Sequence, residues 1–426
     1  MKKLLITGGA RLSGAVSIHG AKNSVLPILA ACCLCSSPCV LHNCPDIEDV
    51  RTALAILEKL GCKTRREGST LCVDASGLHG RSIEKQLAGK MRSSVLFLGA
   101  LLARCREAEL ALPGGCPLGE RPIDLHVKAL SKLGVRFSFD RGVLRARWPQ
   151  ARGGEIVFPF SSVGATENLL LACAIGKEEI TLRGAACEPE VGDLVGFLRA
   201  AGADIRCAGS GVFVVRGVRK LHGATYTILP DRIEAATYLC MAAACGGEIA
   251  LRRCDGRHLL PVIACLQKAG CTVKYEQSGI FLQSSGMLAA VPSVTTAPYP
   301  GFPTDAQAVL MAAVLKAAGE SLFCETVFSR RFLHVAELQK LGADISLCGT
   351  CARVRGVEKL HGAAMRAEDL RGAAALVTAA LTAQGESEIL GLGHLRRGYE
   401  NLEQNLKNLG AAIKSVDIPA PFVYNT

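Results

Sequence analysis

The feature that most constrains the fold is an internal repeat. A helix that ends in glycine and leads into a strand recurs six times, and the six glycines are spaced by 73, 68, 68, 72 and 68 residues: Gly61, Gly134, Gly202, Gly270, Gly342 and Gly410. Glycine is preferred just after a helix because it adopts the left-handed conformation at little cost. Six copies of one folding unit therefore account for most of the chain.

Each copy contains a second helix of a different character. These helices are rich in small apolar residues on nearly all sides, which predicts that they are buried inside sheets. They cover Asn23 to Cys33, Arg92 to Ala103, Ala165 to Ile175, Arg232 to Cys245, Asp305 to Ala318 and Leu370 to Ala383. Alternating polar and apolar residues around a turn with glycine, typical of a hairpin, follow the first five cap glycines. Strand, helix, strand, helix and hairpin in each unit predict an α/β fold.

The six units divide most naturally into two groups of three, which predicts two similar domains with a cleft between them. Duplication is supported by Arg216–Ala224 and Arg355–Ala363, two nearly identical stretches that lie 139 residues apart. The segment from Lys3 to His19 is a strand pair without its own helix, so we expect it to complete the last domain. The predicted domains are residues 22–229, and residues 1–21 together with 230–426.

The composition indicates a folded protein that acts on small anions. Hydrophobic residues make up 49% of the 426 residues and charged residues 20%, which excludes a disordered chain. The start lacks a signal-peptide core and the longest apolar run is too short to span a bilayer, so we expect a soluble, cytoplasmic protein without a membrane partner. The net charge of +11 is scattered, which favours anionic small molecules over nucleic acid. The oligomeric state stays open.

The cysteines are expected to be reduced thiols, because twenty of them are spread over a long chain without a signal peptide. Two Cys-x-x-Cys spacings occur, one beginning at Cys32 and one formed by Cys348 and Cys351. A zinc site usually needs two such pairs together, whereas these lie in a core helix and on a hairpin tip, so we expect no metal. Cys348 and Cys351 could instead form an exposed, oxidisable pair.

One loop combines backbone freedom with a reactive group. Gly114 and Gly115 precede Cys116, and prolines flank the three residues. This run is too poor in side chains to pack as core, so it predicts a mobile loop that carries one thiol, although a structural turn is the alternative. Arg121 lies five positions further on and brings a fixed positive charge to the same region.

Cations also stand at the starts of four inner helices: Lys22, Arg92, Arg232 and Arg371. Neighbouring Ser, Thr, Asn and Asp residues are explained as ordinary N-caps, but a cation beside the positive end of a helix dipole is unfavourable. A bound phosphate or carboxylate would offset this charge, because free backbone amides and cationic side chains both favour anions. The sequence therefore predicts an anion site at the helix starts.

Motifs along nearly the whole chain resemble those of the UDP-N-acetylglucosamine enolpyruvyl transferases, which belong to the enolpyruvyl transferase family. They are Gly20–Asn23, Met91–Ser94, the Gly-Gly-Cys loop with Arg121–His126, Ser162–Asn168, Glu188–Glu190, Leu229–Arg232, Phe302–Asp305, Glu325–Phe328, Asp369–Arg371 and Arg396–Tyr399. The resemblance implies two inside-out α/β barrels of three units each that close on substrate. This sequence differs from some members of the family at two positions: it has Phe160 where they have a lysine, and Tyr299 where they have a histidine.

The activity implied by the resemblance is transfer of the enolpyruvyl group of phosphoenolpyruvate to the 3-hydroxyl of UDP-N-acetylglucosamine, with release of phosphate. This is the first committed step of bacterial peptidoglycan synthesis, it uses no cofactor, and the family is inactivated by fosfomycin. The alternatives are enolpyruvyl transfer to shikimate 3-phosphate, by a related family without a Gly-Gly-Cys loop, and a repeat-built RNA-binding or RNA-end-processing protein.

The resemblance also assigns roles to residues. Cys116 is implied as the proton donor to the enolpyruvate methylene and Asp305 as the base for the sugar hydroxyl. Lys22, Arg121 and Arg397 would hold the donor's phosphate and carboxylate. Further substrate contacts are implied for Asn23, Arg92, Arg371 and a nucleotide site made of Arg121, Pro122, Ile123, Asp124, Leu125, Ser162, Val163, Gly164 and Val327.

Overall fold

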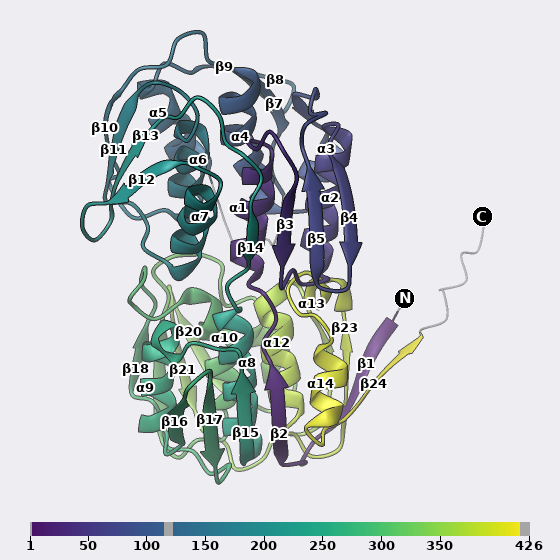
Figure 1. Ribbon diagram of the computed structural model, residues 1–426. Helices are drawn as coiled ribbons and strands as arrows, with labels where there is room; N and C mark the ends of the chain where they lie inside the picture. The colour runs from purple at the N-terminus through teal and green to yellow at the C-terminus, as the bar shows by residue number, and fades with distance from the viewer. Residues whose placement is uncertain (1, 115–121, 418–426) are drawn as a thin grey trace, which may run out of the picture.

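The computed structural model describes residues 2–114 and 122–417 (Figure 1). Within these ranges the strands form six sheets of four strands each. Every sheet has one parallel pair followed by two antiparallel pairs, so the six copies share one topology. The prediction of an α/β fold built from six repeated units is confirmed.

Three sheets lie in the upper half of Figure 1. In spatial order their strands are β14 (Thr225–Thr227), β3 (Cys39–His42), β5 (Thr70–Asp74) and β4 (Lys63–Glu67); β6 (Ser82–Ile83), β7 (Glu107–Ala111), β9 (Val143–Arg147) and β8 (Arg136–Asp140); and β10 (Gly154–Val157), β11 (Glu179–Arg183), β13 (Val212–Arg216) and β12 (Asp204–Cys207).

The other three sheets lie in the lower half and include the two N-terminal strands. Their order is β22 (Ala364–Arg366), β23 (Glu386–Leu390), β1 (Lys2–Thr7) and β24 (Ala412–Asp417); β18 (Ser293–Thr295), β19 (Glu320–Cys324), β21 (Cys351–Arg355) and β20 (Asp344–Cys348); and β16 (Thr272–Glu276), β17 (Gly279–Ser284), β15 (Gly247–Arg252) and β2 (Leu12–Ser17). β1 takes the position that the second hairpin strand holds in the other copies.

The apolar helices of the repeat lie inside each half. They are α1 (Lys22–Cys32), α4 (Leu96–Cys105), α6 (Val163–Cys173), α8 (Arg232–Cys245), α10 (Thr304–Ala313) and α12 (Leu370–Ala380). Almost all of their residues are buried. The buried side chains form two hydrophobic clusters, one within residues 25–228 and one within residues 4–18 and 235–413.

A second set of helices ends at the repeated glycines: α2 (Glu48–Lys59), α5 (Asp124–Lys132), α7 (Pro189–Ala200), α9 (Leu260–Lys268), α11 (Val335–Gln339) and α14 (Leu402–Asn408). All six cap glycines have φ between 90° and 100°, which confirms the predicted left-handed caps. The remaining helical segments are α3 (Lys85–Ala88), α13 (Leu392–Arg396), η1 (Arg92–Val95) and η2 (Gly256–Leu259). No helix in the described ranges is long and apolar enough to cross a membrane.

Two inner helices end three or more residues earlier than their apolar patterns predict. α10 ends at Ala313 and α12 at Ala380, although small apolar residues continue beyond both. Neighbouring segments bind the next carbonyl groups: Val357 N–H donates to the carbonyl oxygen of Leu315 at 2.9 Å, and Gly9 N–H to that of Leu381 at 2.9 Å. Hydrogen bonds from outside the helix therefore replace its last turn.

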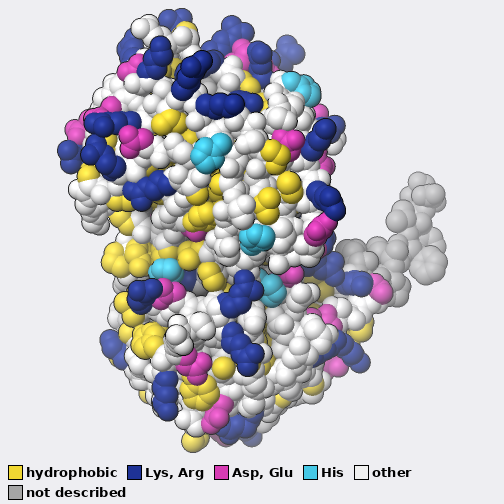
Figure 2. Space-filling view, viewed as in Figure 1, with side chains coloured by type: hydrophobic (Ala, Val, Ile, Leu, Met, Phe, Trp, Pro, Cys, Tyr) yellow, Lys and Arg dark blue, Asp and Glu magenta, His cyan; other side chains and the backbone are white. Residues whose placement is uncertain are grey.

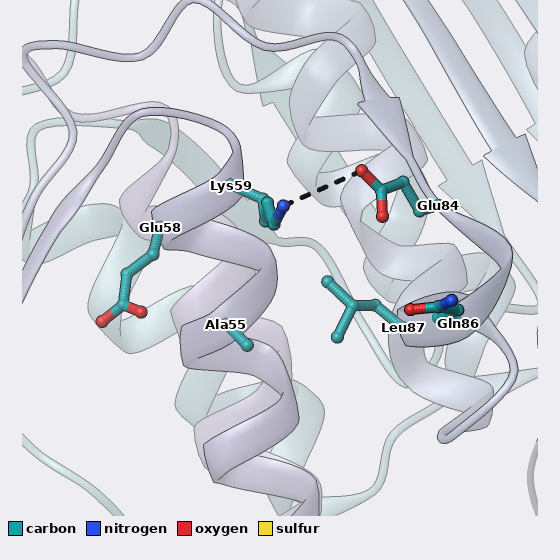
Figure 3. Close-up of a pocket in the computed structure, with 6 residues that line it drawn as sticks. All are labelled: Ala55, Glu58, Lys59, Glu84, Gln86 and Leu87. Atoms are coloured by element: carbon teal, nitrogen blue, oxygen red, sulfur yellow. Dashed lines mark ion pairs between the residues drawn. The ribbon is translucent and has the colours of Figure 1, made fainter.

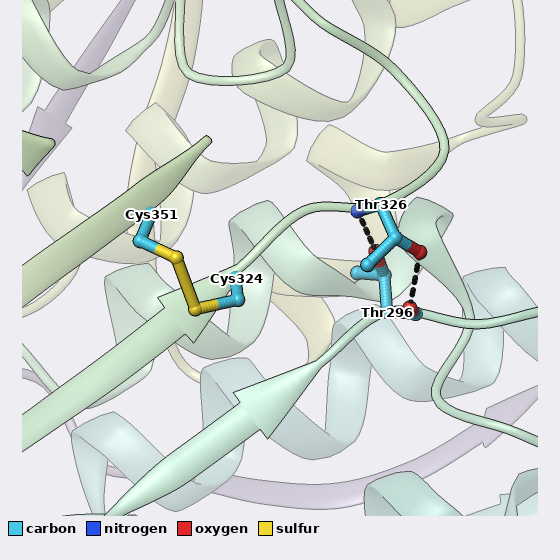
Figure 4. Close-up of a disulfide and its surroundings, with 4 residues drawn as sticks. All are labelled: Thr296, Cys324, Thr326 and Cys351. Carbon is cyan, nitrogen blue, oxygen red and sulfur yellow. Dashed lines mark hydrogen bonds between the residues drawn. A yellow bond between two sulfur atoms is a disulfide. The ribbon is translucent and has the colours of Figure 1, made fainter. Parts of the chain in front are cut away.

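The expectation that the cysteines are reduced is wrong for one pair. Cys324 on β19 and Cys351 on β21 form a disulfide with a Cα–Cα distance of 4.2 Å (Figure 4). The two residues are direct partners across the antiparallel strands, a position that brings side chains close on one face. Cys351 is thus bonded to Cys324 rather than to Cys348, which is a free, exposed thiol.

Candidate functional site

Two predicted site residues from opposite halves of the molecule meet on one carboxylate. Lys22, the first residue of α1, places Nζ 2.9 Å from Oδ2 of Asp49. Arg397, just after α13, places Nε 2.8 Å from Oδ1 and Nη2 3.1 Å from Oδ2 of the same residue. Asp49 lies in the first turn of α2, and only 4% of its side chain is exposed.

These contacts shift the pKa values of the two buried partners. Burial lowers the pKa of Lys22, and the nearby Arg397 and Arg371 add to this effect, while Asp49 opposes it. Burial would raise the pKa of Asp49, but Lys22 and Arg397 outweigh it and hold that pKa below its ordinary value. Asp49 is therefore an ionised carboxylate. It is paired with Lys22 and Arg397, the two cations that are predicted to bind substrate.

Asp305 forms the second part of the site. It is the second residue of α10, and it accepts hydrogen bonds from Nη2 of Arg331 at 2.9 Å and from Nη2 of Arg371 at 3.1 Å. Partial burial would raise the pKa of Asp305, but Arg371, Arg331 and Lys22 hold it far below the ordinary range. Lys22 helps to lower the pKa of Asp305, and Arg371 helps to lower that of Lys22, so the two groups of charges interact electrostatically.

Tyr399 fixes the orientation of Arg371. Its hydroxyl accepts from Nη1 of Arg371 at 3.2 Å and lies 2.9 Å from Oγ1 of Thr237. Burial raises the pKa of Tyr399, so the phenol is neutral near pH 7. Arg371 itself is 4% exposed, and its Nε has no hydrogen-bond partner in the described part of the chain.

The charges at the helix starts are offset differently from the sequence prediction. Carboxylates of the chain itself pair with Lys22 and Arg371, and Glu190 binds Arg232 at 2.9 Å in a buried ion pair. Arg232 is thereby part of the contact between the two halves. Arg92 donates from Nη2 to the carbonyl oxygen of Pro122 at 3.1 Å. An incoming anion must compete with internal carboxylates rather than fill an empty site.

The described part of the predicted nucleotide site surrounds the starts of α5 and α6. Ser162 caps α6 through a bond from Ala165 N–H, and α6 begins with Val163 and Gly164. A β-carbon at Gly164 would lie 3.4 Å from the ring of His126, which shows how closely the two helix starts approach. Ile123 and Leu125 flank Asp124, which pairs with Lys128 at 3.0 Å. Asn23 follows Lys22 in α1, and Val327 lies in the other half, after β19.

Cys116 and Arg121 lie outside the described residues. Gly114 lies within the described residues. The structure gives a different reason for glycine at this position than the backbone freedom that the sequence suggested. A β-carbon there would fall 1.8 Å from the carbonyl oxygen of Gly89, and Gly114 N–H donates to the carbonyl of Ala88 at 3.0 Å. Glycine is needed at this position because two backbones approach closely.

Two site residues escaped the sequence analysis. Asp49 reads as an ordinary acidic residue in a first helical turn, which the helix dipole favours. Arg331 follows Arg330 and reads as a surface charge, although only 2% of it is exposed. Neither residue had a local sequence signal, because Arg331 lies 26 positions from its partner Asp305 and Asp49 pairs with residues from other parts of the chain.

Two other features do not belong to the site. A surface pocket of about 440 Å³ lies between α2 and α3, where Lys59 and Glu84 face each other at 4.0 Å (Figure 3). It is at the opposite end of α2 from Asp49. No group of three or more His, Cys, Asp or Glu side chains among the described residues could hold a metal ion.

Known proteins resemble this chain over nearly its full length. The family model described as EPSP synthase (3-phosphoshikimate 1-carboxyvinyltransferase) matches residues 6–406. UDP-N-acetylglucosamine 1-carboxyvinyltransferase 2 of Caldanaerobacter subterraneus is 46% identical over 97% of this chain and 99% of its own length. The corresponding protein of Novosphingobium aromaticivorans is 44% identical over 98% and 99%.

Solved structures agree in fold. The enolpyruvyl transferase NikO from Streptomyces tendae superposes with a TM-score of 0.90 at 29% identity, covering 98% of this chain and 99% of that one. EPSP synthase from Acinetobacter baumannii gives a TM-score of 0.75 at 18% identity, covering 98% and 100%, and supports the fold alone.

Proposed function

The chain belongs to the enolpyruvyl transferase family, and on that premise we propose that it transfers the enolpyruvyl group of phosphoenolpyruvate to the 3-hydroxyl of UDP-N-acetylglucosamine and releases phosphate. The observation that carries the proposal is the convergence of Lys22 and Arg397, from the two halves, on one buried carboxylate beside Asp305. Relatives at 42–46% identity bear the name of this activity, which favours the amino-sugar acceptor over shikimate 3-phosphate.

Binding of the donor follows from the charges. Phosphoenolpyruvate carries a phosphate and a carboxylate, and each charge-assisted hydrogen bond to such a group contributes about 1.5–3 kcal/mol. Lys22, Arg397 and Arg121 are proposed to take the two anionic groups, with Asn23, Arg92 and Arg371 nearby. In the absence of substrate, Asp49 forms ion pairs with Lys22 and Arg397. The donor would therefore displace the Asp49 carboxylate or share the two cations with it.

The addition step needs one proton removed and one delivered. The sugar hydroxyl forms a bond to C2 of the donor as Asp305 accepts its proton, and Cys116 gives a proton to the C3 methylene. Asp305 is a weak base while two arginines hold it, so recruitment of Arg371 by the donor's carboxylate would raise the pKa of Asp305 toward the working range. Loss of phosphate and of a C3 proton then restores the double bond in the product.

The acceptor's nucleotide is proposed to contact Pro122, Ile123, Asp124, Leu125, Ser162, Val163, Gly164 and Val327, together with Arg121. Gly164 has no side chain to cover its own backbone atoms, which supports a close approach of the ligand to the start of α6. Residues 22–229, and 1–21 with 230–426, are proposed as the two domains that close on the substrates; the two separate hydrophobic clusters support this division. A cytoplasmic role in peptidoglycan synthesis and inactivation by fosfomycin at Cys116 extend the same proposal.

The test is a phosphate-release assay with phosphoenolpyruvate and either UDP-N-acetylglucosamine or shikimate 3-phosphate. We expect release with the amino sugar alone and a loss of at least a hundredfold in Cys116→Ala. Cys207→Ala, which changes an exposed thiol elsewhere, is the matched control. Release with shikimate 3-phosphate would refute the acceptor, and full activity of Cys116→Ala would refute the role of that thiol. Binding of RNA that persists at physiological salt and weakens as the salt concentration is raised would favour the nucleic-acid alternative.

A further inference from the structure

Three cysteines lie in one row across three neighbouring strands. Cys351 on β21 is the direct partner of Cys324 on β19 and also of Cys348 on β20. Directly opposed residues of antiparallel strands project their side chains to the same face. All three sulfur atoms therefore lie on one face of this sheet, and the bonded Cys351 occupies the middle position.

This face of the sheet is open to solvent. The next row on the same face consists of Leu322, Arg353 and Ser346, and all three residues are exposed. Cys348 is exposed, and β20 is the edge strand of its sheet. Cys324 and Cys351 are half-buried. A dissolved disulfide thus reaches Cys348 more easily than it reaches the two bonded cysteines.

The pairing of Cys351 with Cys348 fits disulfide geometry. Cys348 and Cys351 flank a two-residue turn whose first residue, Gly349, has φ of +58°. Residues that flank such a turn form the hydrogen-bonded type of pair, with a Cα–Cα distance of about 5.5 Å. Disulfides bridge Cα–Cα distances of about 4.4–6.8 Å, so Cys351 can bond to Cys348 without moving the strands. Nonbonded Cys348 then competes with Cys324 for the same partner.

We propose that Cys324, Cys351 and Cys348 form a thiol–disulfide exchange site in which the free thiol of Cys348 is the entry point for low-molecular-weight disulfides. The Cys348 thiolate attacks Sγ of Cys351, the Cys324–Cys351 bond breaks, and Cys324 leaves as a thiolate. One disulfide replaces another, so no oxidant is consumed, and the proton lost by Cys348 is balanced by the one that Cys324 takes up.

The exchange frees a cysteine next to the substrate side of the molecule. Cys324 precedes Glu325, whose carboxylate accepts hydrogen bonds from Thr304 Oγ1 at 2.9 Å and from Val327 N–H at 2.7 Å. Glu325 N–H also donates to the carbonyl of Thr350, in the turn between the other two cysteines, at 2.8 Å. The three-cysteine row is therefore one residue from a carboxylate that holds the neighbour of Asp305.

Trypsin separates the two states by mass. Cleavage after Lys316, Arg330, Lys340 and Arg353 leaves Cys324 in one peptide and both Cys348 and Cys351 in another. The Cys324–Cys351 bond links the two peptides, whereas a Cys348–Cys351 bond lies inside the second peptide and leaves Cys324 free to react with N-ethylmaleimide. The protein is first equilibrated with oxidised glutathione, freed of it, incubated at mildly alkaline pH, and sampled over time.

In the wild type we expect the linked pair to convert in part to the internally bonded peptide at a rate independent of protein concentration. In Cys348→Ser, labelling of Cys324 should be at least tenfold slower, while Cys207→Ser should match the wild type because its thiol lies on another sheet. Absence of any Cys324–Cys351 linkage after oxidation, or equal labelling of Cys324 with and without Cys348, would overturn the proposal. Neither readout depends on catalytic activity.

Discussion

Asp49 offers a direct test of how the site holds its cations before substrate arrives. Its two oxygens make contacts of 2.9 Å to Lys22 and of 2.8 and 3.1 Å to Arg397. In Asp49→Asn the side chain keeps its size but loses its charge. We expect the free protein to lose about 3–5 kcal/mol of unfolding free energy, because one partner of a buried ion pair has been removed. A thermal or urea unfolding curve without ligand measures this loss.

The same substitution should strengthen the binding of an anionic donor. In the variant, phosphoenolpyruvate no longer has to displace a carboxylate from Lys22 and Arg397. One charge-assisted hydrogen bond that need not be broken is worth about 1.5–3 kcal/mol, which corresponds to at least tenfold in affinity. Titration calorimetry with phosphoenolpyruvate measures the change. Working at two pH values detects loss of the Lys22 proton in the variant, because burial already lowers the pKa of Lys22 and Asp49 is the carboxylate that opposes it.

The matched control is Asp46→Asn, which lies three residues away and loses an exposed pair with Arg51. It should change both the stability and the donor affinity little, since exposed pairs contribute about 0–1 kcal/mol. Donor affinity that is unchanged or weaker in Asp49→Asn at both pH values would refute the idea that Asp49 competes with substrate for the two cations.

Three further predictions concern folding and pH. Gly114→Ala should lower the melting temperature, because its β-carbon would meet a backbone carbonyl oxygen at 1.8 Å, and an unchanged melting curve would contradict this. Burial lowers the pKa of His126 to about 4, so on acidification the unfolded chain binds this proton before the folded chain does. The free energy of unfolding should therefore fall as the pH drops from 6.5 to 4. In melting curves measured over this pH range, His126→Gln should show a weaker dependence on pH. Arg232→Met should lower the free energy of unfolding in urea by about 3–5 kcal/mol, because it leaves Glu190 buried and unpaired. Arg257→Met removes an exposed ion pair and should lower it by less than about 1 kcal/mol. Equal losses in the two variants would refute the distinction between buried and exposed pairs.

Local patterns made most of the fold predictable from sequence. Gly61 and its five counterparts mark helix ends by backbone conformation alone, so their spacing revealed six units without any knowledge of contacts. The pairing of Arg397 with Asp49 could not be found in this way, because it joins residues 348 positions apart on different halves. The Cys324–Cys351 bond was missed because it depends on the order of strands in a sheet, whereas Cys348 and Cys351 are close in sequence.

The ion pairs also support the proposal that this site binds an anion with more than one charge. Four cations, Lys22, Arg331, Arg371 and Arg397, share two carboxylates, those of Asp49 and Asp305. The carboxylates that cap the neighbouring helices accept backbone N–H groups, as Asp369 does from Arg371 and Gly372. The network of paired side chains therefore carries two positive charges in excess. A donor with both a phosphate and a carboxylate brings at least two negative charges and offsets that excess, whereas a singly charged anion offsets only half of it.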